Sequence, residues 1–181
     1  KEEFDEFKEK VSEIRQEKLE IEDMIEEIEQ EKRERFMDTL EELQESFSEL
    51  FTELFGGGNG ELILEDDDIT KGLKIRAAPP KKDPHIIQAL SGGEKTMTAI
   101  AFVFAILEYE ESPFYIMDEI DAALDKTNSK KLSEILKKYA DDNQFIVISH
   151  NDITVRHADR AYGVSMREGV SQMRSIELDE M

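Results

Sequence analysis

The sequence predicts an α/β fold in which a long N-terminal coiled-coil helix precedes a parallel-sheet core with flanking helices and antiparallel terminal strands. Residues 1–55 contain no Gly or Pro and keep a helical periodicity throughout. Two short apolar runs, 114–117 and 145–148, enclose an amphipathic segment, which is the order of a right-handed parallel crossover. Residues 161–178 alternate in hydropathy around Gly169, which indicates two antiparallel strands.

The first 55 residues form a single helical pattern with an apolar seam. Its steps of three and four residues are those of a coiled coil, with Lys18 and Lys32 also at seam positions. The first seam comprises Phe4, Phe7, Val11, Ile14, Ile21, Ile25 and Ile28. The pattern resumes one residue out of phase at Phe36, Leu40, Leu43, Phe47, Leu50 and Leu54, so the supercoil should change or end near residues 32–35. A solvated single helix is the alternative, but so apolar a seam favours a partner helix from another segment or subunit.

The remaining residues, 56–181, are expected to form the globular lobe. Glycines at 56–58 and 60 should stop the helix. Strands are expected at 61–65 and 72–77, followed by a polar connection between Pro79 and Pro84, and a helix from Ser91 to about Glu110. The run 114–117 fits a strand buried on both faces. A second helix at 127–140 and a second buried strand at 145–148 complete the crossover.

Composition excludes several classes of protein. The absence of cysteine rules out a disulfide framework and a thiolate zinc site. No apolar run approaches the roughly 20 residues of a membrane span, and the charged N-terminus does not resemble a signal peptide, so a cytoplasmic protein is expected. The formal net charge of −21 opposes direct binding of nucleic acid. Any DNA-contacting surface should therefore come mostly from elsewhere.

The hexapeptide Leu-Ser-Gly-Gly-Glu-Lys at 90–95 is the first candidate site. Two glycines let the backbone approach a ligand, and the helix that begins here directs its positive end and free N–H groups to the same place. Ser91 could instead serve only as a helix cap. No G-x-x-x-x-G-K-[ST] phosphate loop occurs in the 181 residues. We therefore expect part of a nucleotide site that this chain cannot complete alone.

Polar residues end both predicted parallel strands, where ligands of such sheets bind. Asp118 and Glu119 follow the first strand, and His150 follows the second. An acidic residue at this place typically holds Mg²⁺, usually through water. The adjacent Glu119 is then placed to orient or deprotonate an attacking water. His150 could donate a hydrogen bond to a γ-phosphate or to that water, with a purely structural role as an equal alternative.

Together these motifs resemble those of a known family. Residues 90–95 are similar to the signature motif of ABC-type ATPases, 116–119 to their Walker B strand, 123–125 to the D-loop, and 149–151 to the switch region. The longer string 113–125, with 145–148 and 161–166, resembles SMC (structural maintenance of chromosomes) proteins specifically. The resemblance covers nearly the whole chain and favours a single-type archaeal or bacterial SMC, with a eukaryotic paralogue left open.

The resemblance implies the C-terminal lobe of an SMC ATPase head, with ATP and Mg²⁺ as cofactors. The complete head would hydrolyse ATP between two engaged heads and drive chromosome condensation, chromosome segregation or DNA tethering. Glu119 and His150 would be catalytic, and Asp118 would hold Mg²⁺ for the head's own nucleotide. The signature motif would contact the γ-phosphate bound by the opposite head. The implied ATP-contacting residues are Leu90, Ser91, Gly92, Gly93, Glu94 and Asp125.

The resemblance also implies partners and a location. The N-terminal lobe of the same protein would bring the phosphate loop, a second head would complete the dimer, and a kleisin subunit would bridge the heads. DNA would be bound through the complete complex, in the cytoplasm and at the nucleoid.

Two other functions stay open at this point. A zinc-hook ATPase of DNA double-strand-break repair is also coiled-coil and ABC-like, but that family usually has Pro where Ile120 follows Glu119. A coiled-coil interaction protein with a degenerate ATPase fold is the other alternative. The intact Ser91, Asp118 and Glu119 argue against it.

Overall fold

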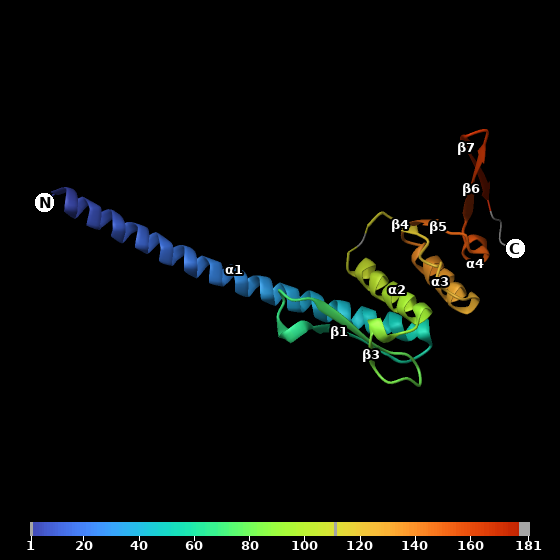
Figure 1. Cartoon of the computed structure of the whole chain (residues 1–181), viewed down its shortest axis with the longest axis horizontal. Coiled ribbons are helices and arrows are strands. Elements are labelled where there is room, and N and C mark those ends of the chain that lie inside the picture. The colour runs from blue at the N-terminus through green and yellow to red at the C-terminus, as the bar shows by residue number, and fades with distance from the viewer. Residues whose placement is uncertain (1, 111, 178–181) are drawn as a thin grey trace.

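The computed structural model describes residues 2–110 and 112–177, in which a small lobe is built around the C-terminal end of one long helix (Figure 1). Two 3-10 turns, Glu65–Asp67 and Ile87–Ala89, supplement the helices and strands. The elements in chain order are α1 (Glu2–Phe55), β1 (Asn59–Leu64), β2 (Leu73–Ala78), β3 (His85–Ile86), α2 (Gly92–Tyr109), β4 (Phe114–Asp118), α3 (Lys126–Tyr139), β5 (Gln144–Ile148), α4 (Asp152–Arg156), β6 (Arg160–Arg167) and β7 (Val170–Glu177). The predicted mixed fold with a long N-terminal helix is confirmed.

Helix α1 lies in two environments. Its N-terminal part extends away from the lobe (Figure 1), and the seam side chains Phe4, Phe7, Ile14, Ile21, Ile25 and Ile28 are each more than half exposed. From Leu40 onward the same helix packs into the lobe, and Phe47, Leu50, Phe51 and Leu54 are buried. The phase shift of the seam near residues 32–35 thus precedes the point where the helix enters the core.

The core lies where the end of α1 meets α2 and α3. The Phe47 ring packs edge-on against Phe51 and Phe102, and Phe51 stacks on Phe55 with ring centroids 4.2 Å apart. Strand β1 lies so close to these rings that a Cβ at Gly60 would stand 2.8 Å from Phe47, so a larger residue would push the strand away.

Polar contacts fasten α1 to the two helices that pack on it. Lys131 of α3 donates to the carbonyl oxygen of Leu54 over 2.6 Å, which satisfies one of the free carbonyl groups at the end of α1. Lys138 of α3 pairs with Glu53. At the other end of the contact, the hydroxyls of Thr39 and Tyr109 lie 2.9 Å apart and join α1 to the last turn of α2. As the sequence predicts, glycines end α1, and Gly56, Gly57 and Gly58 all have positive φ.

The strands form three separate sheets. Strands β1, β2 and β3 pair in antiparallel order, and β4 pairs with β5 in parallel. Strands β6 and β7 form an antiparallel hairpin that projects from the lobe (Figure 1) and turns at Glu168 and Gly169, both with positive φ. The predicted terminal hairpin is confirmed for residues 160–177; residue 178 lies outside the described part of the chain. The sequence did not predict β3, α4 or the two 3-10 turns.

The expectation that β4 and β5 are buried on both faces is wrong for one face. Met117, Phe145 and Val147 belong to the core or pack against it, and the half-buried Tyr115 stacks on Phe145. The alternate residues point the other way and are 46% to 64% exposed, namely Phe114, Ile116, Ile146 and Ile148. A continuous apolar run predicts a strand that is covered on both faces, but within the described residues only one face is covered.

Within the part of the chain that the structure describes, no helix is both long and apolar enough to cross a membrane.

The two environments of α1 should give opposite responses to the same substitution. Phe51 is 0% exposed and Phe7 is 68% exposed. Phe51→Ala should lower the free energy of unfolding by about 3–5 kcal/mol, because it removes a ring from a packed core. Phe7→Ala should change it by no more than about 0.5 kcal/mol. Urea unfolding of both variants at a concentration where the chain is monomeric is the measurement, and equal losses would contradict the packing of α1 described above.

Candidate functional site

The carboxyl ends of β4 and β5 meet at one edge, and a backbone hydrogen bond fixes their relation there. Asp118 is paired in register with Ile148. The N–H of Glu119 donates to the carbonyl oxygen of Ile148 over 2.8 Å. Glu119 has φ of 48°, a left-handed conformation that costs a residue other than Gly roughly 1–2 kcal/mol. Such strained backbone is typical of functional sites.

The turn at Glu119 directs the two adjacent carboxylates into different hollows. Asp118 lies in a groove between α2 and β4, whereas Glu119 lies in a second hollow with residues of the 149–151 turn. In a continued strand, neighbours would simply alternate between faces. The left-handed Glu119 departs from this alternation, and its carboxylate lies beside the 149–151 turn.

Glu119 and His150, which the sequence placed at the ends of the two parallel strands, lie side by side. Oε1 of Glu119 lies 3.4 Å from Nε2 of His150, and both side chains are exposed, His150 at 90%. The pair is an ion pair only when the imidazole is protonated; a neutral imidazole can still donate a hydrogen bond. An exposed carboxylate beside an exposed imidazole can accept and pass on a proton from a water molecule at this edge.

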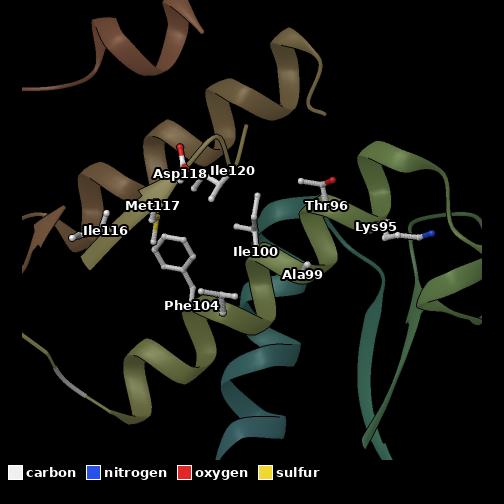
Figure 2. A pocket seen from close by; sticks show the side chains of 10 residues that line it. Lys95, Thr96, Ala99, Ile100, Phe104, Ile116, Met117, Asp118 and Ile120 are labelled. Carbon is white, nitrogen blue, oxygen red and sulfur yellow. The ribbon is translucent and has the colours of Figure 1, made fainter. Parts of the chain in front are cut away.

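Asp118 lines the groove between α2 and β4 (Figure 2). In Figure 2, Thr96, Ile100 and Phe104 of α2 face β4, and the amine of Lys95 points away from Asp118. The Asp118 side chain makes no hydrogen bond or ion pair with any described residue, so its carboxylate oxygens are free. A lone carboxylate fits Mg²⁺, which usually keeps several waters and takes one or two carboxylates plus substrate phosphates. No group of three or more acidic or His side chains suited to a metal occurs among the described residues.

The predicted signature motif lies at the N-terminus of α2, as expected. Ser91 is the N-cap residue, and the first bond of the helix runs from the Lys95 N–H to the Ser91 carbonyl oxygen over 2.8 Å. The N–H groups of Gly92 and Gly93 precede that bond and have no partner inside the helix. Gly92 is exposed, and a Cβ added there would meet nothing within 4 Å. Packing within this chain therefore does not explain the glycine at 92.

Glu94 faces back toward the start of the helix. Its carboxylate accepts from the N–H and the hydroxyl of Ser91, over 3.2 and 2.6 Å, and pairs with Lys82 over 2.6 Å. The Lys82 ammonium first, and then the Ser91 hydroxyl, lower the pKa of Glu94. With the contact of the Ser91 side chain to the Glu94 N–H, this forms the capping box that the pattern Ser-x-x-Glu favours at helix starts. Because the Ser91 hydroxyl hydrogen is engaged by Glu94, an anion at this helix end would first meet the N–H groups of the two glycines.

The other two predicted ATP contacts also have local structural roles. Leu90 is buried in the core. Asp125 is the N-cap residue of α3, and its Oδ1 accepts from the Asn128 N–H over 2.8 Å. The predicted D-loop lies next to the signature motif, since a Cβ on Gly93 would stand 3.7 Å from the Ala123 carbonyl oxygen. The roles of Leu90, Glu94 and Asp125 toward ATP stay predictions.

Sequence reasoning missed the buried carboxylate of Asp121 and the polar residues around it. Nothing in the sequence distinguishes Asp121 from its exposed acidic neighbours. Asn151 followed by Asp152, a cap residue before an acidic first turn, was a signal for α4. In the structure Asn151 caps α4 by accepting from the Ile153 N–H over 2.9 Å.

Comparison with known proteins identifies the family. A profile described as "RecF/RecN/SMC N terminal domain" matches residues 4–172. The chain belongs to the SMC family. It is 46% identical over 177 residues to the chromosome partition protein Smc of Pyrococcus furiosus, a match that covers 97% of this chain and 15% of the relative. This SMC chain thus spans about 15% of the length of that relative.

Solved SMC structures share the fold. The Smc head domain of Pyrococcus furiosus, crystallised with an extended coiled coil and bound to the C-terminal domain of ScpA, is 46% identical with a TM-score of 0.82. The match covers 96% of this chain and 44% of that one. A second structure, from work on ATP-driven dimerization and DNA-stimulated activation of SMC ATPases, is 46% identical with a TM-score of 0.77. It covers 81% of this chain and 90% of that one, so the predicted SMC head fold is confirmed and the zinc-hook alternative is not favoured.

Replacing Lys82 tests the cause of the low Glu94 pKa. Lys82→Met should raise the pKa of Glu94 toward its ordinary value, because the largest stabilising contact is lost. A lowered folded-state pKa contributes stability that is present above the unfolded-state pKa, near 4.5, and is lost as pH falls through the folded-state value. The variant should therefore be less stable than the parent at neutral pH, with the difference shrinking in acid.

NMR titration of the Glu94 side chain and thermal unfolding at pH 7 and pH 3 are the measurements. Lys81→Met, which removes the adjacent exposed lysine, is the control and should leave the Glu94 titration in place. A Glu94 titration that Lys82→Met also leaves unmoved would contradict the assignment.

Proposed function

We propose that this chain is the C-terminal half of an SMC ATPase head. Completed by the N-terminal lobe, it binds ATP and hydrolyses it between two engaged heads, and this drives chromosome condensation, segregation or DNA tethering. The observation that carries the proposal is the strand-end turn that holds Glu119 3.4 Å from His150, in a chain with no phosphate loop of its own.

Two open apolar surfaces support a head that is completed by other segments. The exposed face of β4 and β5 carries four large apolar side chains on a parallel sheet, a type of sheet that is normally covered on both faces. The N-terminal lobe covers this face in the proposed head. The exposed seam of α1 needs a helix of its own, and the antiparallel helix leaving the N-terminal lobe supplies it.

In the proposed reaction, the strand ends act on the nucleotide of their own head. Asp118 would hold Mg²⁺, usually through water, and the ion would supply positive charge to the phosphate oxygens. Glu119 orients the attacking water and accepts its proton. His150, held beside Glu119, donates a hydrogen bond to the γ-phosphate or to that water.

The signature motif acts on the other head's nucleotide. The N–H groups of Gly92 and Gly93 and the positive end of α2 contact the γ-phosphate from the opposite side. The open space at Gly92 supports this role, because a ligand outside the chain accounts for a glycine that local packing does not require.

The partners follow from the same proposal. One related SMC structure comes from work on ATP-driven dimerization and DNA-stimulated activation, and another is a head bound to ScpA; we extend these interactions to this chain. A second head and a ScpA-like kleisin bind the completed head in the cytoplasm. DNA is contacted through the whole complex, since a formal net charge of −21 opposes strong binding by this chain.

Glu119→Gln tests the catalytic assignment. In the complete head, the variant should still bind ATP but turn over roughly 10²–10⁴-fold more slowly, because an amide cannot accept the proton of the attacking water. Steady-state ATPase assays and ATP-binding calorimetry are the measurements, and the engaged dimer should accumulate.

Asp142→Asn, which neutralises an exposed carboxylate in the turn after α3, is the matched control and should keep the parental rate. The chain without the N-terminal lobe should show no turnover. A Glu119→Gln rate within about twofold of the parent would exclude Glu119 as the catalytic carboxylate.

Ser91→Arg tests the contact across the dimer. A long cationic side chain at the start of α2 would fill the space that the opposite γ-phosphate needs and oppose the helix dipole. ATP binding should persist while head engagement is lost, measured by sedimentation with ATP in the Glu119→Gln background. Ser171→Arg on the exposed hairpin is the control. A normal ATP-dependent dimer with Ser91→Arg would refute the assignment.

A further inference from the structure

Asp121 is a buried carboxylate that the proposed chemistry does not use. It is only 3% exposed, two residues beyond Glu119, where the chain turns away from β4. Its Oδ2 accepts a hydrogen bond from the Ser149 hydroxyl over 2.6 Å and another from the Thr154 hydroxyl. A buried carboxylate needs such donors, because burial without them carries a large desolvation cost.

The hydroxyl of Ser149 links Asp121 to the backbone next to His150. Ser149 Oγ donates to Asp121 and also accepts from the Asn151 N–H over 2.9 Å. The turn is thereby closed around His150 and anchored on one side to Asp121. The His150 side chain is exposed, and among the described residues its polar partner is Glu119.

The other side of the turn is anchored to α3. The side-chain amide of Asn151 donates to the Ser129 hydroxyl over 2.8 Å. Ser129 is fully buried, and its N–H donates to the Asp125 carbonyl oxygen over 2.8 Å. A continuous chain of hydrogen bonds therefore joins Asp121, the turn around His150 and the residue that caps α3.

We propose that Asp121 is a positioning residue that sets the distance between His150 and Glu119, acting through Ser149 and resting on the proposed ATPase function. Both flanks of His150 are held by buried groups, while the imidazole is exposed, so the backbone of the turn decides where the ring lies. Because the same network ends at Asp125, a displacement of the D-loop alters the pair of catalytic side chains. The hydrogen bonds thus link the predicted D-loop, at Asp125, to the predicted switch region at 149–151.

Ser149→Ala in the complete head is the first test. The hydroxyl that connects Asp121 to the turn is lost, so kcat should fall about tenfold or more while the KM for ATP stays within about twofold, since small misplacements of reacting groups are costly. Ser133→Ala is the matched control, because it removes a different interior serine hydroxyl, one that donates to the Ser129 carbonyl oxygen, and Ser133 makes no contact with the turn. It should leave kcat within about twofold. Equal effects of the two variants would overturn the proposal.

Substitutions of Asp121 itself test whether its oxygen is the anchor. Asp121→Asn keeps an acceptor of the same shape and should retain most of the kcat that Asp121→Ala loses. Combining Asp121→Ala with Ser149→Ala should lower kcat little more than the larger single loss, because both substitutions remove the same hydrogen bond between Asp121 and Ser149. If the double variant instead loses kcat by the product of the two single factors, the residues act independently, which would contradict the proposal.

A measurement that does not depend on ATP turnover distinguishes the positioning role of Asp121 from the proposed ATPase function. In a head with labelled His and Glu, a nuclear Overhauser contact between the His150 ring and the Glu119 side chain should be present in the parent and in Ser133→Ala. It should be lost in Ser149→Ala, and its persistence there would overturn the positioning role. If the contact behaves as expected but the parent head does not hydrolyse ATP, the proposed function fails and the positioning role stands.

Discussion

The parallel pairing of β4 with β5 brings two strand ends to one edge, and the hydrogen bond from Glu119 to Ile148 extends that pairing one residue further. The rest of the site depends on this extension. It accompanies the left-handed conformation of Glu119, whose carboxylate lies beside the turn after β5. Without the bond, the strained conformation would have little to offset its cost.

Local signals in the sequence were sufficient to locate the elements that carry the site. The apolar runs before Asp118 and His150 and the glycines after Ser91 predicted two strand ends and one helix start, and the structure has all three. These predictions succeed because they depend on residues adjacent in the chain. The closeness of Glu119 and His150 followed from one further rule, that parallel strands share the edge at which their carboxyl ends lie.

The remaining features depend on contacts between distant residues, which no local pattern reports. The apolar run 114–117 gave no sign that Ile116 would be exposed, because hydropathy does not say which covering segment belongs to the same chain. Lys82 reaches Glu94 from a loop, and Asp121 receives hydroxyls from residues 149 and 154. Each of these contacts exists only once the lobe has folded, so the ion pair of Glu94 with Lys82 and the burial of Asp121 could not be read from the sequence.

The continuity of α1 gives the molecule a mechanical property. The helix is fastened to α2 through Thr39 and Tyr109 and to α3 through Lys131. The ion pair of Arg33 with Asp67 lies further toward its N-terminus, and residues 2–32 extend beyond that contact. At 1.5 Å per residue this segment is about 47 Å long. If the lobe turns as a rigid body by about 10°, the tip of the helix moves by about 8 Å, because displacement grows with the length of the arm. The helix thus converts a small rotation of the lobe into a larger displacement of its distant N-terminal end.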